Sequence, residues 1–373
     1  MATTGICGSR TSPKIRRGNR SISGHGVSLQ RSFGVICEIP FGPAERDRIA
    51  RATTLAEIEF RPPASSDHQP PRPGARPDFG SARVLISHWP PTEWSLPSGL
   101  HWIQLDSAGV DYLEDNQVWS KDVTITNAAG AYAVQIGQYI FANLLSVVEG
   151  VAQRREIQAK RFWPRSDAEH DQMVGRLLRG QTVVIVGYGG IGREVARLAR
   201  TFGMRVVALK AHPDLRQDET FCLPGTGDPE GMIPDEVLAI SSLVDAARSA
   251  DVLVVAVPLT TKTRHLVDAS VLSALSSRAW IVNVARGAVI DEAALVRVLN
   301  EGRIGGAILD VFEDEPLPID SPLWGFSNTI VTPHVAGGGE ASRQLFSLLV
   351  AENLGRFADG LPLTNVVDRV ARY

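Results

Sequence analysis

A glycine-rich turn joins an apolar run to an amphipathic segment near the middle of the chain, and it reads Gly187-Tyr188-Gly189-Gly190-Ile191-Gly192. Between a strand and a helix, such a motif binds a dinucleotide. Gly187 permits a tight turn, Gly189 lets the backbone approach a pyrophosphate, and Gly192 allows the helix to pack closely on the strand. The first amide groups of the helix, which include those of Gly190 and Ile191, would then face the phosphates. The spacing predicts a dinucleotide site, with a purely structural strand–helix turn as the less favoured alternative.

The residue at the end of the next strand bears on which dinucleotide is bound. An Asp or Glu at that place, about 20 residues after the glycines, accepts a hydrogen bond from the ribose 2′-OH. Here the strand VVAL ends in Lys210. A lysine cannot accept that bond, but it can pair with a 2′-phosphate, and His212 could add a second donor. The residue chemistry favours NADP, and a solvated lysine with NAD as cofactor is the alternative.

Composition limits the classes of protein to which the chain can belong. It has 373 residues, 44% of them hydrophobic, which is enough for two domains with sizeable cores. A formal net charge of −3 gives no basic field for nucleic acid or an anionic membrane. The three cysteines are widely separated and lack metal-type spacing, which fits a reducing compartment such as the cytoplasm and predicts no metal. The apolar runs are strand-length and too short to span a bilayer.

Residues 1–31 differ from the rest of the chain. They are rich in Ser, Gly and Arg and contain no acid, the first acid being Glu38. Such a composition is typical of a disordered tail or of an organellar transit peptide. The tail is the favoured reading, because no amphipathic apolar face is visible.

The order of apolar runs predicts two α/β units. Strands are expected at 33–41, 56–61, 82–87 and up to Leu105, with a Pro-rich exposed connection over 61–80. Helical periodicity then continues for some thirty residues, from Ala133 to Trp163. From Arg179 onward, strands are expected at 182–186, 205–209, 252–257, 280–284 and 307–311, with helices between them. This alternation predicts a parallel sheet covered on both faces. The segment 212–243 is expected to be a long surface loop beside the cofactor edge.

Six motifs occur in one order and spacing: SAGVD, VGYGGIG, VPLTTKTRHLV, VNVARGAVIDEAAL, AILDVFEDEPLP and SPLWGFSNTIVTPHVAG. With them, the chain resembles the D-isomer-specific 2-hydroxyacid dehydrogenases, in particular the glyoxylate/hydroxypyruvate reductase branch, from about residue 33 onward. The resemblance implies a Rossmann-type, doubly wound nucleotide domain (129–337) inserted in a smaller flavodoxin-like α/β substrate domain (32–128 completed by 338–373).

The resemblance also implies three catalytic residues. Arg286 in NVARG matches the arginine that orients the substrate, Glu315 in FEDEP the carboxylate partner, and His334 in TPHVAG the acid/base histidine. Their chemistry suits the reduction of a 2-oxo acid, because a protonated histidine can donate to the C2 oxygen and a carboxylate favours its charged form. A guanidinium can hold the substrate carboxylate or polarise the carbonyl. Taken singly, each residue is more often a solvated or structural side chain.

Further positions follow from the same resemblance. The backbone amides of Ala108 and Gly109 in SAGVD would receive the substrate carboxylate. Asp310 would lie near the nicotinamide and Val257-Pro258 beside the adenine. Val284 and Ala285, just before Arg286, complete the set of cofactor-contacting positions.

The chain departs from the family pattern at two positions. Lys210 replaces the usual acid, and Gln138 stands where many relatives carry a glutamate. The short segment after NVVD leaves no room for the regulatory domain of some phosphoglycerate dehydrogenases.

The resemblance implies a homodimer that acts on a small 2-oxo or 2-hydroxy acid, with no nucleic-acid or membrane partner. The rivals are a dinucleotide-sensing, corepressor-like binding protein and a formate- or phosphite-type dehydrogenase of the same fold. Which 2-oxo acid is reduced stays open.

Overall fold

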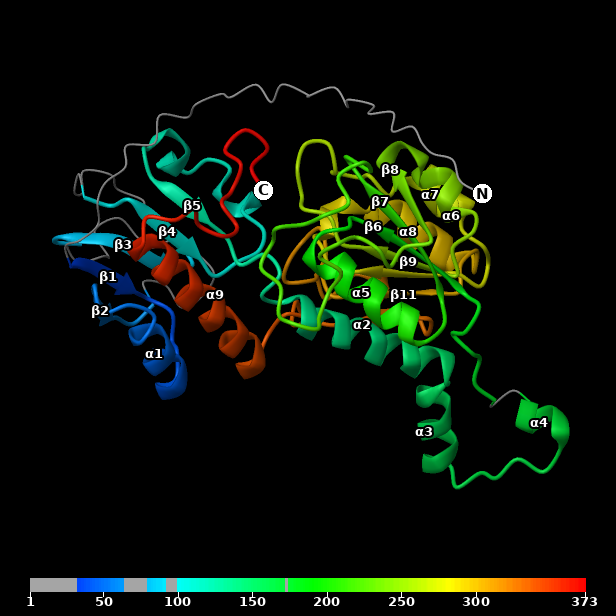
Figure 1. Ribbon diagram of the computed structural model, residues 1–373. Coiled ribbons are helices and arrows are strands. Elements are labelled where there is room, and N and C mark those ends of the chain that lie inside the picture. Colours follow the sequence, from blue (N-terminus) through cyan, green and yellow to red (C-terminus); the bar gives the residue numbers. More distant parts are fainter. Residues whose placement is uncertain (1–31, 64–78, 92–98, 172–173) are drawn as a thin grey trace, which may run out of the picture.

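The computed structural model describes residues 32–63, 79–91, 99–171 and 174–373. These residues form two lobes, each built on a parallel sheet (Figure 1). The expected tail (1–31) and most of the expected Pro-rich connection lie outside the described residues. Within the described residues, no helix is both long and apolar enough to cross a membrane.

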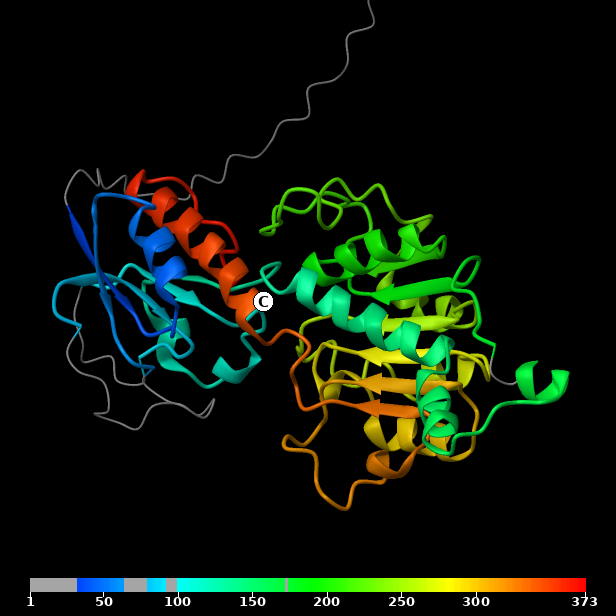
Figure 2. The same cartoon turned by 90° about the horizontal axis from the view of Figure 1, so that it is seen from below.

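The five-stranded lobe contains the sheet with order β2-β1-β3-β4-β5 among the described residues. This is the flavodoxin-like order, as predicted. Its strands are β1 (Phe33–Cys37), β2 (Ala56–Phe60), β3 (Ala82–Ser87), β4 (Trp102–Leu105) and β5 (Thr124–Thr126). Helices α1 (Pro43–Ala50) and α9 (Glu340–Ala358) lie side by side over one face of the sheet (Figure 2). The last long helix of the chain therefore returns to the first lobe, where Phe346 and Leu349 join the core of β1.

The seven-stranded lobe contains the sheet with order β12-β11-β10-β9-β6-β7-β8 among the described residues, and every pairing is parallel. The order reverses between β6 and β9, which is where open α/β sheets bind ligands at the carboxyl ends of their strands. Its strands are β6 (Thr182–Val186), β7 (Arg205–Lys210), β8 (Glu236–Ala239), β9 (Val252–Val255), β10 (Trp280–Asn283), β11 (Gly306–Leu309) and β12 (Thr329–Val331). The predicted α/β class with a doubly wound sheet is confirmed.

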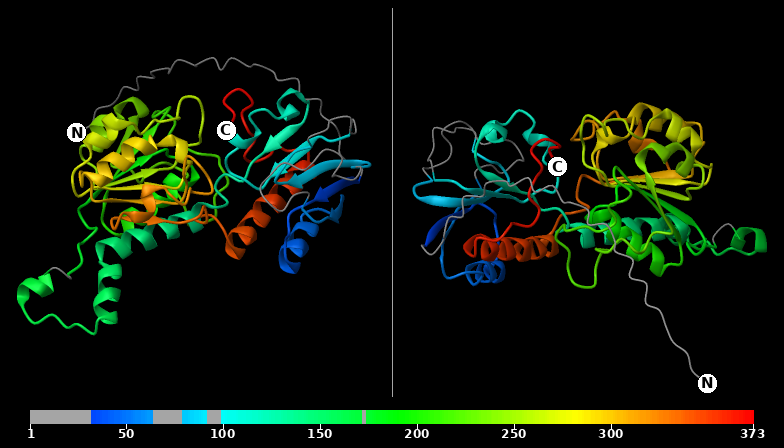
Figure 3. Two further views of the ribbon diagram at one scale, coloured as in Figure 1. Left: turned by 180° about the vertical axis from the view of Figure 1, so that it is seen from behind. Right: turned by 45° about the horizontal axis from the view of Figure 1, so that its top comes forward.

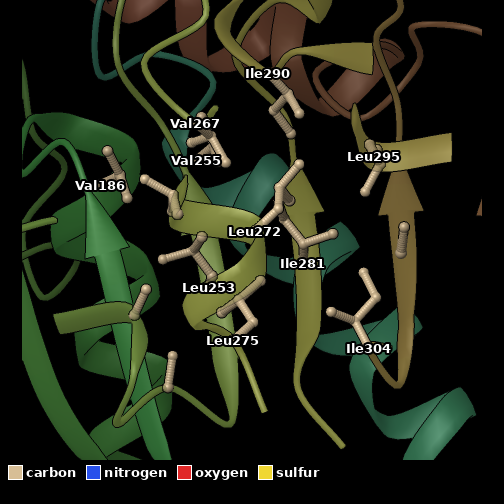
Figure 4. Packing of buried hydrophobic residues seen from close by; sticks show 14 of the residues in the cluster. Val186, Leu253, Val255, Val267, Leu272, Leu275, Ile281, Ile290, Leu295 and Ile304 are labelled. Carbon is tan, nitrogen blue, oxygen red and sulfur yellow. The ribbon is translucent and has the colours of Figure 1, made fainter. Parts of the chain in front are cut away.

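Alternating side chains build a core on each face of this sheet. Leu253 and Val255 of β9 pack, with Ile281 of β10, against the helices of one face (Figure 4). These helices are α6 (Leu243–Ala247), α7 (Ala269–Ala274) and α8 (Glu292–Asn300). Val252 and Val254 point to the other face, which is covered by α2 (Ala133–Val148) and α5 (Gly190–Thr201). Because both faces are covered, the strands read as continuous Val, Ile and Leu runs.

The prediction of one continuous thirty-residue helix is wrong. Helix α2 ends at Val148, and Gly150 takes a left-handed conformation with φ of 62° before α3 (Val151–Ala159) begins. Glycine adopts that conformation without steric cost, so the chain turns there. Helix α3 buries none of its residues, and with α4 (Asp167–Asp171) it forms an arm that projects from the seven-stranded lobe (Figures 1 and 3).

The expected loop 212–243 is also only partly correct. Irregular backbone runs from 211 to 235, after which β8 adds an edge strand, a 3₁₀ turn covers Ile240–Ser242, and α6 begins at Leu243. Sequence patterns missed β5 and β12, which have three residues each, and β8, whose four residues are exposed or half-buried. The segment 211–235 reaches toward the five-stranded lobe (Figure 2), where Phe221 is buried in the core of β1.

Candidate active site

Arg286 connects the two lobes at the carboxyl ends of their strands. It follows β10, and its Nε lies 3.2 Å from Oδ1 of Asp111 in the other lobe. Its own position is fixed by Asn283, the last residue of β10, whose Nδ2 donates to the Arg286 carbonyl over 3.0 Å. Arg286 also lies against Gly109, where an added Cβ would collide with Nη2. A larger residue there would displace the guanidinium from this position.

In the turn at residues 106–110, backbone carbonyls are hydrogen-bonded and two backbone amides are left for a ligand. Its carbonyls accept bonds from the segment that leads into α2: Ser107 O from the amide of Ala128 at 2.9 Å, and Ala108 O from Asn127 Nδ2 at 2.8 Å. Within the described part of the chain, the amides of Ala108 and Gly109 have no hydrogen-bond acceptor. Two unpaired amides beside a guanidinium form a site suited to a carboxylate.

His334 and Glu315 form a pair on neighbouring loops of the seven-stranded lobe. His334 Nδ1 lies 2.8 Å from Glu315 Oε2, and Glu315 Oε1 accepts from the Phe312 amide at 3.0 Å. Burial acts to raise the pKa of Glu315, but the bonds from His334 and Phe312, with the nearby Arg286 charge, hold it below its ordinary value. An ionised Glu315 can accept the proton on Nδ1, which leaves Nε2 of the half-exposed ring without a partner in this pair.

Asp310 holds the backbone of the His334 loop. It follows β11 and is 2% exposed, and its two carboxylate oxygens accept bonds from Thr332 Oγ1 and from the amides of Val335 and Ala336 at 2.5–2.9 Å. His334 between them has a left-handed φ of 53°. The carboxylate therefore stabilises a loop conformation that a non-glycine residue rarely adopts.

A second histidine–carboxylate pair lies in the five-stranded lobe, close to the amide turn. His88 Nδ1 is 2.7 Å from Asp106 Oδ1, and the His88 ring stacks on Tyr112 with 5.1 Å between ring centroids. Tyr112 follows Asp111 directly, so this pair belongs to the same group of loops as the Arg286 contact.

Comparison with known proteins identifies the family. Residues 141–336, more than half of the chain, match the family described as D-isomer specific 2-hydroxyacid dehydrogenase, NAD binding domain. The chain belongs to this family.

Individual relatives agree with the assignment. A glyoxylate reductase of Aeropyrum pernix is 34% identical over 271 residues, which cover 70% of this chain and 75% of the relative. An (S)-sulfolactate dehydrogenase of Chromohalobacter salexigens is 31% identical over 66% of this chain and 74% of its own. A solved family member from Aeromonas salmonicida superposes with a TM-score of 0.68 at 29% identity and covers 91% and 99% of the two chains. The NADPH-dependent glyoxylate/hydroxypyruvate reductase of Sinorhizobium meliloti, solved with NADP and sulfate, gives 0.67 at 25% over 92% and 100%.

The glycine motif of this dehydrogenase has the geometry that a dinucleotide requires. Gly187 has φ of +101°, and an added Cβ would lie 2.5 Å from Ala256 O. A Cβ at Gly192 would collide with Gly187 O, whereas one at Gly189 would meet open space. The first amides of α5, which begins at Gly190, lack intrahelical acceptors. These residues fit a nicotinamide dinucleotide.

The other expected cofactor positions follow strand ends of the same sheet. Val257 and Pro258 come after β9, while Val284 and Ala285 come after β10 and are both nearly buried. Because these strands are parallel, their following residues lie along one edge of the sheet with the glycine motif.

Lys210 ends β7 as predicted, but its ammonium donates to the Leu215 carbonyl in the loop that follows. Burial and the nearby Arg193 charge lower its pKa, while Asp218 acts in the opposite direction. One of three ammonium protons is thus used within the protein. His212 is exposed.

Segment 211–235 is attached to the glycine motif by residues that sequence reasoning did not single out. Tyr188 Oη donates to Asp228 Oδ2 over 2.6 Å, and the buried Arg193 donates to Asp218 Oδ2 over 3.0 Å. Glu194 accepts from the Gly227 amide at 2.7 Å. This segment is therefore an ordered part of the cofactor edge and not a loosely attached surface loop.

Other site residues were missed although they stand in or beside quoted motifs. Asp111 ends SAGVD, Asn283 lies in VNVARG and Thr332 precedes PHVAG. Gln138, by contrast, is exposed on α2, and its side chain has no hydrogen-bond partner among the described residues.

Proposed function

We propose that the protein reduces a small 2-oxo acid of the glyoxylate or hydroxypyruvate type to the D-2-hydroxy acid. The observation that carries this proposal is the contact of Arg286 with Asp111 and Gly109 of the other lobe, with the His334–Glu315 pair on the adjacent loops. In this proposal the substrate domain comprises 32–128 and 338–373, and the nucleotide domain comprises 129–337.

The amides of Ala108 and Gly109 bind the substrate carboxylate together with Arg286. The guanidinium suits this role because its planar donors match a carboxylate. His334 then donates the Nε2 proton to the C2 oxygen as negative charge develops there, and Glu315 stabilises the charged ring. When bound, the reduced nicotinamide supplies the hydride that C2 receives.

We propose Gly187, Gly189, Gly190, Ile191 and Gly192 as the pyrophosphate-binding turn. Val257, Pro258, Val284, Ala285 and Asp310 complete the cofactor site along the same edge of the sheet. Lys210 favours NADP over NAD, because two of its protons remain for a 2′-phosphate after the bond to Leu215. A cytoplasmic location accords with Cys37 and Cys222, which are free cysteines among the described residues.

The projecting arm supports a homodimer. Phe162, Trp163, Val174 and Leu177 are exposed between 44% and 78% on this arm, which buries none of α3. Several large apolar side chains exposed along one short stretch of chain suit an interaction surface. Sedimentation velocity of wild type and of Trp163→Asp tests the proposal: we expect a dimer that the substitution weakens, and a monomeric wild type contradicts it.

Steady-state reduction of glyoxylate, hydroxypyruvate, pyruvate and phenylpyruvate, each with NADH and NADPH, tests the activity. Saturable oxidation of the cofactor by at least one of these acids supports the proposal. Tight cofactor binding without turnover of any of them would instead favour a dinucleotide-sensing binding protein.

A further inference from the structure

One face of helix α2 contacts both halves of the proposed site. Tyr132, which precedes the helix, Ile136 and Tyr139 are spaced i, i+4 and i+7, so they lie on one side of two helical turns. The helix starts between the lobes and runs along the seven-stranded sheet (Figure 2). The position of α2 therefore affects both the turn that would bind substrate and the loop that carries His334.

At the start of the helix, Tyr132 holds the turn at residues 106–110. Its hydroxyl donates to the Asp106 carbonyl, next to the Ser107 and Ala108 carbonyls held by residues 127 and 128. Burial raises the pKa of Tyr132, so the hydroxyl stays protonated and remains a donor. The direction of the amides of Ala108 and Gly109 is thus fixed from the start of α2.

Two turns later, Tyr139 holds the histidine loop. Its Oη lies 2.6 Å from Thr332 Oγ1, which lies 2.5 Å from Asp310 Oδ1. A carboxylate only accepts, so Thr332 donates to Asp310 and must accept from Tyr139. Burial raises the pKa of Tyr139 to about 12, which keeps this donor protonated.

The chain of bonds continues to the backbone on either side of His334. Asp310 accepts the amides of Val335 and Ala336, and the His334 amide donates to Asp310 O at 2.8 Å. Ile136 Cδ1 lies 3.5 Å from the position of an added Cβ at Gly337, so the loop also packs on the same face of α2. The loop is therefore fixed by hydrogen bonds and by packing.

We propose that Tyr139 is a positioning residue for His334, and that Tyr132 and Tyr139 make α2 the spacer between the carboxylate-binding turn and the acid/base histidine. This inference rests on the proposed function. A proton donor misplaced by about 1 Å can cost a factor of 10² in rate. A rigid helix that fixes the distance between the two parts of the site would therefore affect the rate directly.

Tyr139→Phe tests the inference because it removes the hydroxyl and keeps the ring packing. We expect kcat to fall about 10-fold, with KM for the 2-oxo acid and the Kd of the cofactor within about 2-fold of wild type. The primary deuterium isotope effect on kcat, measured with cofactor deuterated at the transferred position, should rise because hydride transfer becomes slower. Tyr132→Phe should instead raise KM for the 2-oxo acid about 5-fold.

Asn143→Ala is the matched control on the same helix, where the Asn143 side chain bonds back to Tyr139 O. It should leave all these constants unchanged. In a His334→Ala background, Tyr139→Phe should cause no further loss, because it acts through His334. An unchanged kcat in Tyr139→Phe, or full additivity with His334→Ala, overturns the inference.

Failure of the proposed function would be distinguishable from failure of this inference. A wild type that reduces no 2-oxo acid refutes the function, and the spacer is then judged by amide hydrogen exchange in the cofactor-free protein. Faster exchange at Val335 and Ala336 in Tyr139→Phe, but not in Asn143→Ala, supports it. Equal exchange in the two variants overturns it.

Discussion

Arg286 Nε lies 3.2 Å from both carboxylate oxygens of Asp111, across the boundary between the two lobes. Both side chains are about a quarter exposed, so solvent only partly screens the pair. Asp111 thus aims the guanidinium at the turn that contains Gly109. The position of Arg286 in the proposed substrate site therefore depends on how the two lobes are placed, because neither lobe contains both partners.

Asp111→Asn should reduce the precision with which Arg286 is held. We expect kcat/KM for 2-oxo acids to fall about 5- to 30-fold, as the loss of about 1–2 kcal/mol of a partly exposed charge-assisted bond would cause. Cofactor affinity should not change. Asp115→Asn, the same chemical change at an exposed position of the same loop, is the control. Equal kinetics in the two variants would show that Arg286 keeps its position without Asp111.

His334→Ala should remove the proton donor. General acid catalysis typically contributes about 10²- to 10⁴-fold, so we expect kcat to fall within that range while the Kd of the cofactor barely changes. His265→Ala is a matched control, since His265 also pairs with a carboxylate, Glu313, at 2.8 Å. Single-turnover kinetics with both variants would separate chemistry from product release. A near-wild-type rate in His334→Ala would remove this residue from the mechanism.

Glu315→Gln should change the pH dependence of reduction. The pKa of Glu315 is lowered, so its carboxylate is ionised throughout the neutral range and protonates only as the pH falls below the ordinary range of a glutamate. Without that negative charge, a positive charge on the neighbouring ring is less well stabilised. The alkaline limb of the kcat/KM profile should therefore move to lower pH. A profile that coincides with that of wild type, measured with the same 2-oxo acid, would contradict the pairing.

The seven-stranded lobe could be largely predicted from the sequence, because its strands are continuous apolar runs bounded by turn residues. The same patterns missed β8, whose residues Glu236 to Ala239 are exposed or half-buried at a sheet edge. They also extended the helix at Ala133 through Gly150, although a glycine is visible there between Glu149 and Val151. Short edge strands and single left-handed residues carry too little periodic signal to be read in this way.

The roles of the site residues could be inferred from the motifs, but their partners could not. Arg286 and Asp111 are 175 residues apart, and Tyr139 and Thr332 are 193 apart. Such contacts depend on how two lobes and a helix are packed, which no local pattern specifies. The attachment of segment 211–235 through Arg193 and Asp228 was missed for the same reason. The catalytic and cofactor assignments remain predictions until variants are measured.

Lys210→Asp tests the choice of cofactor. If the ammonium pairs with a 2′-phosphate, wild type should show a lower KM for NADPH than for NADH. The substitution removes that attraction, introduces repulsion, and offers the 2′-OH of NADH an acceptor. The preference should therefore reverse, and we expect the ratio of kcat/KM values to change about 10- to 100-fold, or about 1.4 to 3 kcal/mol, because an edge charge is screened. Asp218 lies close enough to act on Lys210 and could offset part of this effect.

Lys121→Asp, a charge reversal in the other lobe, should leave the ratio unaltered. A wild type that prefers NADH, with no response to Lys210→Asp, would show that the bond to Leu215 is the main role of this lysine and that the cofactor is NAD.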